Sequence, residues 1–303
     1  MDVCAKLRGI LKERRIGHGG TLDPMATGVL PVFVGNATKA AQYAENSIKE
    51  YIGILRLGMI TDTQDITGNI LETRDINPDI ITPERVKNIM REFTGEMEQT
   101  PPMYSAVKIN GKKLYQLARK GKEIPRPPRK IKIYELELLN QDLNQDKLLN
   151  LDLDLKQDLD LNQENNKNNL DFAFRCRCSK GVYIRTLCHD MGLALGCGGV
   201  LYALRRTMAA GFREVDAVSL EYIEKNIRET GDYNAFLRPV DSLFDQYPAF
   251  TVPTPEAERK IRHGNPIKTR IPDGIYRVYA PDGAFLCLSE AKNGVLTSQK
   301  NFF

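Results

Sequence analysis

The sequence of 303 residues predicts an α+β protein with a small β domain at its C-terminal end. Alternation of apolar and polar residues, which is typical of half-buried strands, occurs at residues 51–57, 131–139 and 172–178. Apolar residues at helical spacing occur at residues 2–14, 82–93, 183–195 and 200–206. From residue 247 onward, prolines and short alternating segments replace the helical spacing. We therefore expect two domains, residues 1–246 and residues 247–303.

Local signals support several of these elements. The helix expected at residues 2–14 places four apolar side chains on one face: Val3, Leu7, Ile10 and Leu11. The helix expected at residues 82–93 begins with Thr-Pro-Glu, which is a common helix start. Pro-Asp-Gly turns at residues 272–274 and 281–283 separate short strands in the C-terminal domain.

One segment departs from this pattern. Residues 140–169 consist almost entirely of Asn, Gln, Asp, Leu and Lys, which predicts a low-complexity insertion between two strands. Leu and Asp alternate at residues 151–155, as they would in a short hairpin extension. We expect no catalytic role for this insertion.

The composition is that of an ordinary globular protein, with 42% apolar and 27% charged residues. No apolar run approaches the roughly 20 residues that span a bilayer, and the first residues lack a signal-peptide pattern. We therefore expect a cytoplasmic protein. The six cysteines lack the paired spacing of a zinc site and the three histidines are scattered, so we expect reduced core thiols and no metal site.

A basic segment points to a polyanionic partner more strongly than the net charge of +4 does. Tyr104 and Tyr115 lie within or beside it, and Pro125, Pro127 and Pro128 keep the chain extended. Such a segment suits an RNA phosphate backbone, although a solvated basic face would have the same composition. Its basic residues are Lys108, Lys112, Lys113, Arg119, Lys120, Lys122, Arg126, Arg129, Lys130 and Lys132.

A loop rich in glycine and proline displays a single carboxylate, Asp23, at residues 17–32. Glycines allow a backbone to approach a ligand closely, and Pro24 fixes the chain just after the acid. The apolar, β-branched run at residues 29–34 predicts a core strand that anchors the loop. Because Asp before Pro is also common in turns and caps, the spacing alone leaves a structural role open.

These loop residues resemble the signature motif of the TruB family of tRNA pseudouridine synthases, which runs Gly-His-Thr-Gly-Thr-Leu-Asp-Pro and then Ala-x-Gly-Val-Leu-Pro. Gly19 stands here in place of the first Thr. Residues 49–68, 100–108 and 178–207 resemble the other family motifs, so the resemblance covers nearly the whole chain apart from the insertion. The family usually carries a strand with a Lys-Pro motif ahead of the first helix, and this sequence begins at that helix.

The resemblance implies a pseudouridine synthase fold, with a central mixed, mainly antiparallel sheet flanked by helices. It also implies a small PUA-like C-terminal domain that binds RNA. The implied reaction converts the uridine at position 55 in the T loop of tRNA to pseudouridine, with no cofactor and no metal. We expect a monomer that binds the T arm of tRNA, with no protein partner and no membrane.

The same resemblance assigns roles to individual residues. Pseudouridine formation breaks the bond between uracil and ribose, rotates the base and rejoins it through carbon, on a nucleotide turned out of its stack. Asp23 matches the nucleophile, Arg185 the partner that keeps it charged, and Tyr51 the ring that stacks on the base and assists proton removal from C5. The remaining matches, with the flipped nucleotide or the RNA, are His18, Tyr183, Leu204 and Lys39. Attack at C1′ and elimination to a glycal both remain open.

Three alternative functions share parts of this pattern. A dyskerin-like, guide-RNA-dependent synthase has the same motifs, and the sequence lacks the long basic extensions expected of it. A tRNA-folding chaperone without chemistry would not need Asp23 and Arg185. A glycosidase would need a second acid near the first, for which Asp62 and Asp65 are the nearest candidates.

Overall fold

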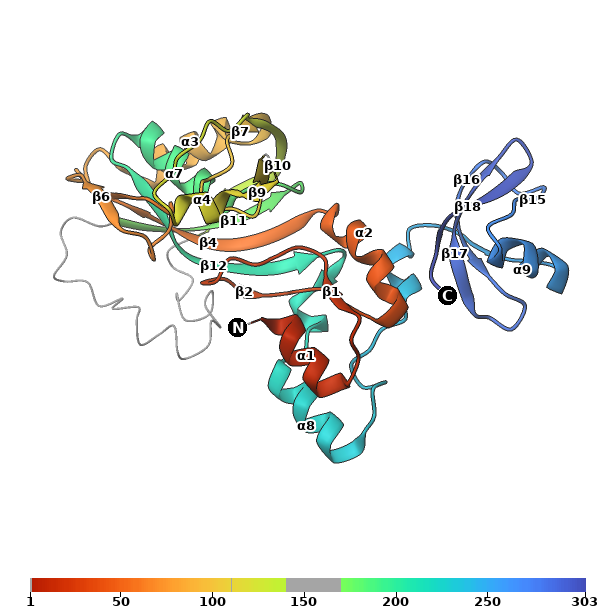
Figure 1. Ribbon diagram of the computed structural model, residues 1–303. Coiled ribbons are helices and arrows are strands. Elements are labelled where there is room, and N and C mark those ends of the chain that lie inside the picture. Colours follow the sequence, from red (N-terminus) through yellow and green to blue (C-terminus); the bar gives the residue numbers. More distant parts are fainter. Residues whose placement is uncertain (1, 110, 140–169) are drawn as a thin grey trace. The chain divides into compact units, whose positions relative to one another are not determined.

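The computed structural model describes residues 2–109, 111–139 and 170–303 (Figure 1). These residues form two compact units. The central unit comprises Leu22–Val29 and Asn46–Val215, and the terminal unit comprises Met1–Thr21, Leu30–Glu45 and Asp216–Phe303. The predicted low-complexity insertion at residues 140–169 lies outside the described residues.

The central unit is built on a seven-stranded sheet with the order β13-β12-β4-β11-β10-β7, in which β2 also pairs with β12. Every pair is antiparallel except β2 with β12, so the predicted mixed, mainly antiparallel sheet is confirmed. The strands are β2 (Thr27–Gly28), β4 (Lys49–Leu57), β7 (Gly95–Gln99), β10 (Arg129–Leu138), β11 (Leu170–Cys178), β12 (Gly199–Ala209) and β13 (Phe212–Arg213).

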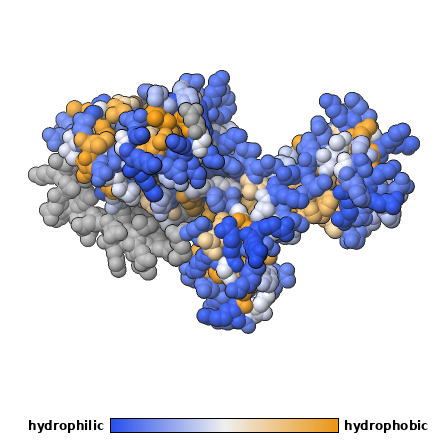
Figure 2. All heavy atoms as spheres, viewed as in Figure 1, coloured by the Kyte–Doolittle hydropathy of each residue, from blue (hydrophilic) through white to orange (hydrophobic). Residues whose placement is uncertain are grey.

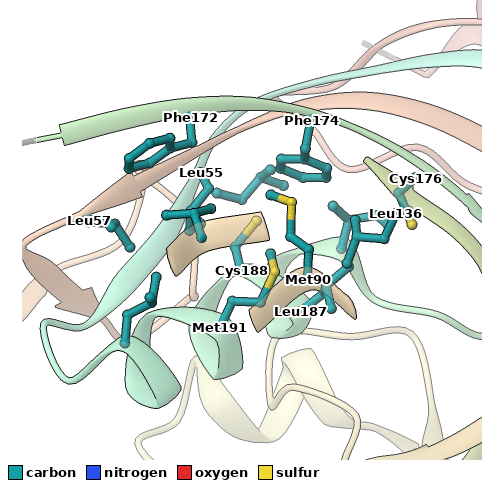
Figure 3. Close-up of a cluster of buried hydrophobic side chains, with 14 of the residues drawn as sticks. Leu55, Leu57, Met90, Leu136, Phe172, Phe174, Cys176, Leu187, Cys188 and Met191 are labelled. Carbon is teal, nitrogen blue, oxygen red and sulfur yellow. The ribbon is translucent and has the colours of Figure 1, made fainter. Parts of the chain in front are cut away.

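Helices α3 (Pro83–Glu92) and α7 (Ile184–Leu195) pack on one face of this sheet (Figure 1). Their apolar side chains meet those of β4, β10 and β11 in a single buried cluster (Figure 3). Phe174 lies directly across from Gly53, where any added Cβ would come 2.6 Å from the Phe174 ring. The glycine therefore leaves the space that a large aromatic side chain fills.

The predicted strands at residues 51–57, 131–139 and 172–178 and the predicted helices at residues 82–93 and 183–195 are confirmed as β4, β10, β11, α3 and α7. Thr82 caps α3 by accepting a hydrogen bond from the Arg85 amide. The first helix is shorter than the predicted residues 2–14. It spans Val3–Leu11, because Lys12 adopts a left-handed conformation that ends it.

The helix predicted at residues 200–206 is wrong, because this segment lies within strand β12. β12 pairs with β4 along nearly its whole length and with β2 and β13 on its other edge. Five of the six residues Gly199–Leu204 are buried, and a strand that is buried on both faces reads as a continuous apolar run rather than as an alternation. Two register shifts, at Leu201/Ala203 and at Arg206/Met208, further disrupt the period of two.

The core strand predicted at residues 29–34 is only partly correct. Residues 32–34 form β3, which pairs with β1 (Ile16–His18) in a two-stranded sheet of the terminal unit. Val29 precedes this strand, and its amide donates to the carbonyl of Arg206 at 2.8 Å. In the central unit, the loop that carries Asp23 is therefore anchored on β12 through residues 27–29.

Smaller elements complete the central unit. They are the hairpin of β5 (Met59–Thr61) and β6 (Ile70–Thr73), the hairpin of β8 (Lys108–Ile109) and β9 (Lys112–Lys113), and helix α4 (Leu114–Ala118). The short helix η2 (Glu214–Asp216) begins in the central unit, and its last residue belongs to the terminal unit. The hairpin β8–β9 and α4 belong to the predicted basic segment.

The terminal unit contains two apolar clusters. In one, α1 (Val3–Leu11) packs with α8 (Leu220–Thr230), β1 and β3. The other lies within a five-stranded sheet with the order β14-β16-β17-β18-β15 and the helix α9 (Pro255–Arg262). Its strands are β14 (Ala249–Thr251), β15 (Ile267–Lys268), β16 (Gly274–Tyr279), β17 (Phe285–Lys292) and β18 (Val295–Asn301). Hydrophilic residues cover most of its visible face (Figure 2), and its buried apolar residues form the second cluster.

Aromatic rings connect this C-terminal sheet to other parts of the terminal unit. Phe244, in the short helix η3 (Val240–Phe244), lies 5.1 Å from Tyr43 of α2 (Ala41–Glu45) and 5.6 Å from Phe302, measured between ring centroids. All six cysteines of the chain are free and buried, as expected for core thiols.

Replacement of Phe174 by Ala should destabilise the central unit by about 3 to 5 kcal/mol, because it removes a fully buried ring and leaves a cavity between β11 and α7. Urea denaturation measures this loss. Leu71→Ala, at a side chain 66% exposed on β6, should change the free energy of unfolding by less than about 0.5 kcal/mol. Equal losses in the two variants would contradict the position of the core.

Candidate active site

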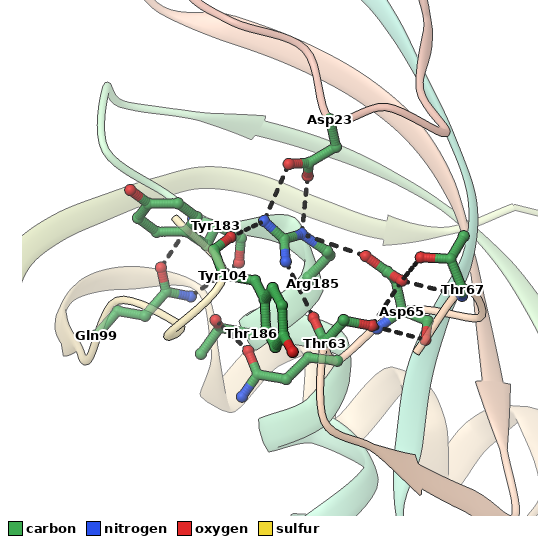
Figure 4. A network of polar contacts seen from close by, with 10 residues as sticks. Asp23, Thr63, Asp65, Thr67, Gln99, Tyr104, Tyr183, Arg185 and Thr186 are labelled. Atoms are coloured by element: carbon green, nitrogen blue, oxygen red, sulfur yellow. Dashed lines mark hydrogen bonds and ion pairs between the residues drawn. The ribbon is translucent and has the colours of Figure 1, made fainter. Parts of the chain in front are cut away.

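A two-point ion pair between Asp23 and Arg185 belongs to a network of polar contacts in the central unit (Figure 4). Arg185 Nε donates to Asp23 Oδ2 at 2.9 Å, and Nη2 donates to Oδ1 at 3.0 Å. The arginine side chain is 5% exposed, whereas the aspartate side chain is 28% exposed. The fork geometry fixes the orientation of the carboxylate and leaves part of it open to solvent. The structure thus brings together two residues predicted to act together.

Arg185 is buried, and two more of its N–H groups donate to backbone carbonyls. Nη1 donates to the carbonyl of Thr63 at 3.0 Å, and Nη2 donates to the carbonyl of Tyr104 at 2.9 Å. A second carboxylate oxygen, Asp65 Oδ2, lies 3.6 Å from Nε. A buried guanidinium is tolerated when its charge and its N–H groups are matched in this way.

Asp65 belongs to a tight turn whose own contacts hold it in place. Its Oδ1 accepts from the hydroxyl of Thr63 at 2.8 Å and from the hydroxyl and amide of Thr67 at 2.6 and 3.0 Å. The turn is fixed against β12, because the Leu201 amide donates to the Gln64 carbonyl. The carboxylate is therefore committed to the turn and to Arg185, which does not suit the free second acid of a glycosidase.

Arg185 lies in the first turn of α7, and polar contacts orient this turn. Gln99, at the end of β7, bonds both backbone groups of Tyr183, the residue that precedes the helix. The Thr186 hydroxyl donates to Gln64 Oε1 at 2.7 Å, so the turn at residues 61–68 is also tied to α7.

Tyr51 lies on β4 between two cross-strand neighbours, Arg206 of β12 and Cys176 of β11. Burial raises the pKa of the Tyr51 phenol to about 12, and a hydrogen bond and the positive charge of Arg206 oppose part of this rise. The negative charge of Asp23 acts on the same phenol. Tyr51 thus belongs to the same electrostatic environment as the ion pair.

Arg206 connects Tyr51 to the loop that carries Asp23. It is 1% exposed, and its Nε donates to the carbonyl of Val29 at 2.8 Å. Gly28 has a φ of +96°, and an added Cβ would lie 2.3 Å from the Arg206 carbonyl oxygen. Only glycine accepts both this conformation and this close approach.

The other predicted site residues lie in different settings. Leu204 is buried in the apolar cluster beside Gly53, and Tyr183 is half-buried. His18 and Lys39 belong to the terminal unit. His18 is an exposed residue of β1, and Lys39, in η1 (Gly35–Ala40), donates to the carbonyl of Phe303 at 3.1 Å.

Our sequence interpretation assigned no role to Gln99 or Arg206, and it considered Asp65 only as the second acid of a glycosidase. Asp65 and Arg206 lie within segments that resemble family motifs, and Gln99 directly precedes one. The sequence signal for such residues is only that a polar residue stands at the end of a predicted strand or inside an apolar run. Only the three-dimensional contacts turn this signal into a role.

Two properties of the described residues bear on other classes of function. Among residues 2–109, 111–139 and 170–303, no group of three or more His, Cys, Asp or Glu side chains is placed to hold a metal ion. None of the described helices has the length and apolar content needed to cross a membrane.

The raised pKa of Tyr51 predicts a specific alkaline instability. The neutral phenol is favoured in the folded protein, so its contribution to stability is complete below pH 10 and is lost as the pH rises toward about 12. Over this window the wild type should lose about 2 to 3 kcal/mol more than Tyr51→Phe. Urea titrations at several pH values measure the difference. Tyr134→Phe, at an exposed ring of β10, is the control and should lose as much stability as the wild type. If Tyr51→Phe also loses as much stability as the wild type over this pH range, the assignment is refuted.

Comparisons with known proteins identify the family. The model of the TruB family pseudouridylate synthase (N terminal domain) matches residues 8–184, and that of the tRNA pseudouridylate synthase B C-terminal domain matches residues 185–245. The tRNA pseudouridine synthase B of Clostridium kluyveri is 39% identical over 302 residues, which cover 96% of this chain and 91% of that protein. The protein of the same name from Bacillus cytotoxicus is 41% identical over 270 residues, covering 89% of this chain and 80% of that protein.

Solved structures show the same fold. The chain resembles a chain of a Cbf5-Nop10-Gar1 complex with a TM-score of 0.66 and 24% identity, covering 100% of this chain and 80% of that one. A structure of an H/ACA RNP bound to a substrate RNA containing 2'-deoxyuridine gives a TM-score of 0.66, 21% identity and the same coverage. The family models and the curated relatives together show that this chain belongs to the TruB family of pseudouridylate synthases.

Proposed function

We propose that this protein isomerises a uridine of tRNA to pseudouridine, with Asp23 as the nucleophile, and that the uridine is the one at position 55 of the T loop. The observation that carries the proposal is the ion pair of Asp23 with Arg185, inside the segment that resembles the family signature. The names of the curated relatives support tRNA as the substrate.

In the proposed reaction, a carboxylate oxygen of Asp23 attacks C1′ of the flipped nucleotide. The bond between N1 and C1′ breaks, and its electron pair leaves with the uracil. After the base rotates, a bond forms between C5 and C1′, the Asp23 ester is released, and the C5 proton is lost while N1 gains one. In the alternative route, Asp23 removes the C2′ proton and a glycal replaces the ester. Both routes need a carboxylate held in a fixed direction, which Arg185 supplies.

Tyr51 is proposed to stack on the target base. A phenol with a pKa of about 12 stays neutral at physiological pH, so its ring presents an uncharged face. Stacking of a base on an aromatic ring is worth roughly 1 to 3 kcal/mol. The Arg206 guanidinium offsets only part of the rise in this pKa, and we propose that Tyr51 assists proton removal from C5 in the same site as a neutral phenol.

RNA binding is proposed for the basic segment at residues 108–132. Seven of its ten basic residues are exposed, and both Lys113 and Arg119 lie within 6 Å of the Tyr115 ring, at 5.6 and 5.4 Å. We also propose RNA contacts for a PUA-like domain at residues 247–303. The other proposed contacts with the nucleotide or RNA are His18, Lys39, Tyr183 and Leu204.

The protein is further proposed to act as a cytoplasmic monomer that needs neither guide RNA nor a protein partner. Family membership and the curated tRNA-named relatives favour this assignment over a guide-dependent enzyme. Size-exclusion chromatography with light scattering, with and without tRNA, tests the monomer.

Asp23→Asn should abolish turnover and leave tRNA affinity within about threefold, because the amide keeps the shape of the side chain but is not a nucleophile. Release of tritium from tRNA labelled at C5 of uridine measures turnover, and filter binding measures affinity. A transcript with cytidine at position 55 should release no tritium.

Each outcome of this experiment separates the alternatives. Release that persists with cytidine at position 55 would contradict the proposed position, and release from Asp23→Asn would contradict the nucleophile. Tight binding without release by the wild type would favour the chaperone. Release that requires added guide RNA would favour the dyskerin-like enzyme.

The basic segment should govern the salt dependence of binding. Lys112→Ala and Lys120→Ala should each weaken tRNA binding and reduce the slope of log affinity against log salt by about 1, since each removes one phosphate contact. Lys225→Ala, at an exposed position of α8 outside the segment, should leave the slope unchanged. Slopes that match the wild type in all three variants would place the RNA elsewhere.

A further inference from the structure

The side chain of Gln99 makes a reciprocal pair of hydrogen bonds with the backbone of Tyr183 (Figure 4). The Tyr183 amide donates to Gln99 Oε1 at 2.8 Å, and Gln99 Nε2 donates to the Tyr183 carbonyl at 3.1 Å. Gln99 is 5% exposed. The side-chain amide thus bonds the N–H and C=O groups of Tyr183 as the backbone of a neighbouring strand would. Its carbonyl and its NH₂ group both bond this one residue.

The paired residue is the one from which α7 begins. Tyr183 has an extended backbone, with φ −100° and ψ 107°, and makes no side-chain capping bond. Its carbonyl also accepts the first helical bond, from the Leu187 amide at 3.0 Å. Contacts to the Tyr183 backbone therefore help to set the direction in which the helix starts, alongside the bond of Thr186 to Gln64, and Gln99 supplies two of them from outside the helix.

Two features connect this start to the ion pair. Arg185 follows Tyr183 by two residues and lies in the first turn of α7. Gln99 ends β7 and is followed by the segment that leads to Tyr104, whose carbonyl accepts from Arg185 Nη2. A displacement at the start of α7 would thus move the guanidinium relative to Asp23 and to the carbonyl of Tyr104 together.

We propose that Gln99 is a positioning residue for the reaction, which aligns Arg185 and the Tyr183 ring through the backbone of Tyr183. The inference rests on the proposed function for its kinetic consequences. It requires both halves of the amide, one donor and one acceptor, because Tyr183 presents one of each. Misplacement of a catalytic group by about 1 Å can reduce a rate by roughly 100-fold, so a modest shift of the helix start is sufficient.

The decisive variant is Gln99→Glu, which keeps the shape of the side chain. A protonated Glu carries one O–H donor and one acceptor and reproduces the pair, whereas an ionised Glu turns a negative charge toward the Tyr183 carbonyl. Burial and this carbonyl raise the pKa of the introduced carboxyl. The paired geometry should therefore be present at low pH and lost as the pH rises.

The measurement is kcat at saturating tRNA between pH 5.5 and 8.5, expressed as a ratio to the wild type at each pH. For Gln99→Glu we expect the kcat ratio to be about 0.1 or less at high pH and to rise toward 1 at low pH. KM should change less than twofold. For Gln99→Met, which cannot make either bond, the ratio should stay low at every pH. A ratio for Gln99→Glu that is flat with pH would overturn the proposal.

A matched control separates positioning from general loss of stability. Asp171→Asn breaks a two-point ion pair with Arg56, of 2.7 and 2.9 Å, elsewhere in the same sheet. It should lower the free energy of unfolding while leaving kcat and its pH profile unchanged. If Asp171→Asn reproduces the kinetic pattern of Gln99→Glu, then Gln99 acts only through stability and the proposal fails.

Amide hydrogen exchange gives a readout that does not depend on activity. Exchange rates are first corrected for the intrinsic effect of pH. After this correction, exchange at residues 183–187 should be faster than in the wild type for Gln99→Met at every pH. For Gln99→Glu it should be faster only at high pH. Wild-type exchange there in both variants would overturn the inference. A wild-type protein that makes no pseudouridine in tRNA would instead overturn the proposed function, and the exchange result would still decide the role of Gln99.

Discussion

Burial of the Arg185 guanidinium is the constraint on which the rest of the central unit depends. A positively charged side chain that is 5% exposed is tolerated only if other groups replace the water that it has lost. Four of its hydrogen bonds are made to three separate segments, through Asp23, Thr63 and Tyr104. Three loops that are far apart in the sequence thus meet at Arg185 of α7. The residue with which each loop contacts Arg185 lies outside the strands of the central sheet.

The apolar core between the sheet and the helices also holds α7 in place. The cluster under α7 includes fully buried side chains of β4, β11 and α3, so the helix has little freedom to shift. The turn at residues 61–68 is fixed both to β12, through the Leu201 amide, and to α7, through Thr186. The polar network and the apolar core therefore restrain the same helix, one at its first turn and the other along its length.

Sequence patterns were sufficient for β11, in which buried residues alternate with less buried ones, for β10, and for α3, which carries a recognisable cap. β4 was also predicted within a few residues, although its residues 53–57 are all buried. β12 was mistaken for a helix because five of the six residues Gly199–Leu204 are buried, which hides the alternation of a strand, and because two register shifts interrupt it. The ion pair of Asp23 with Arg185 was expected only through the family resemblance, since 162 residues separate its members. Gln99 was missed, because a single amide at the end of a strand forms no pattern.

The second carboxylate changes the electrostatics of the pair. Asp65 lies 3.6 Å from Arg185 Nε and is held by Thr63 and Thr67 rather than by solvent. The guanidinium charge is therefore compensated from two directions, one partly exposed and one buried. If Asp23 gives up its negative charge on forming a bond, as in the covalent route, Asp65 remains, and Arg185 does not become an uncompensated buried cation. Asp23 is thus the carboxylate that faces solvent, and Asp65 is the buried carboxylate that continues to compensate the arginine. A single ion pair could not provide both.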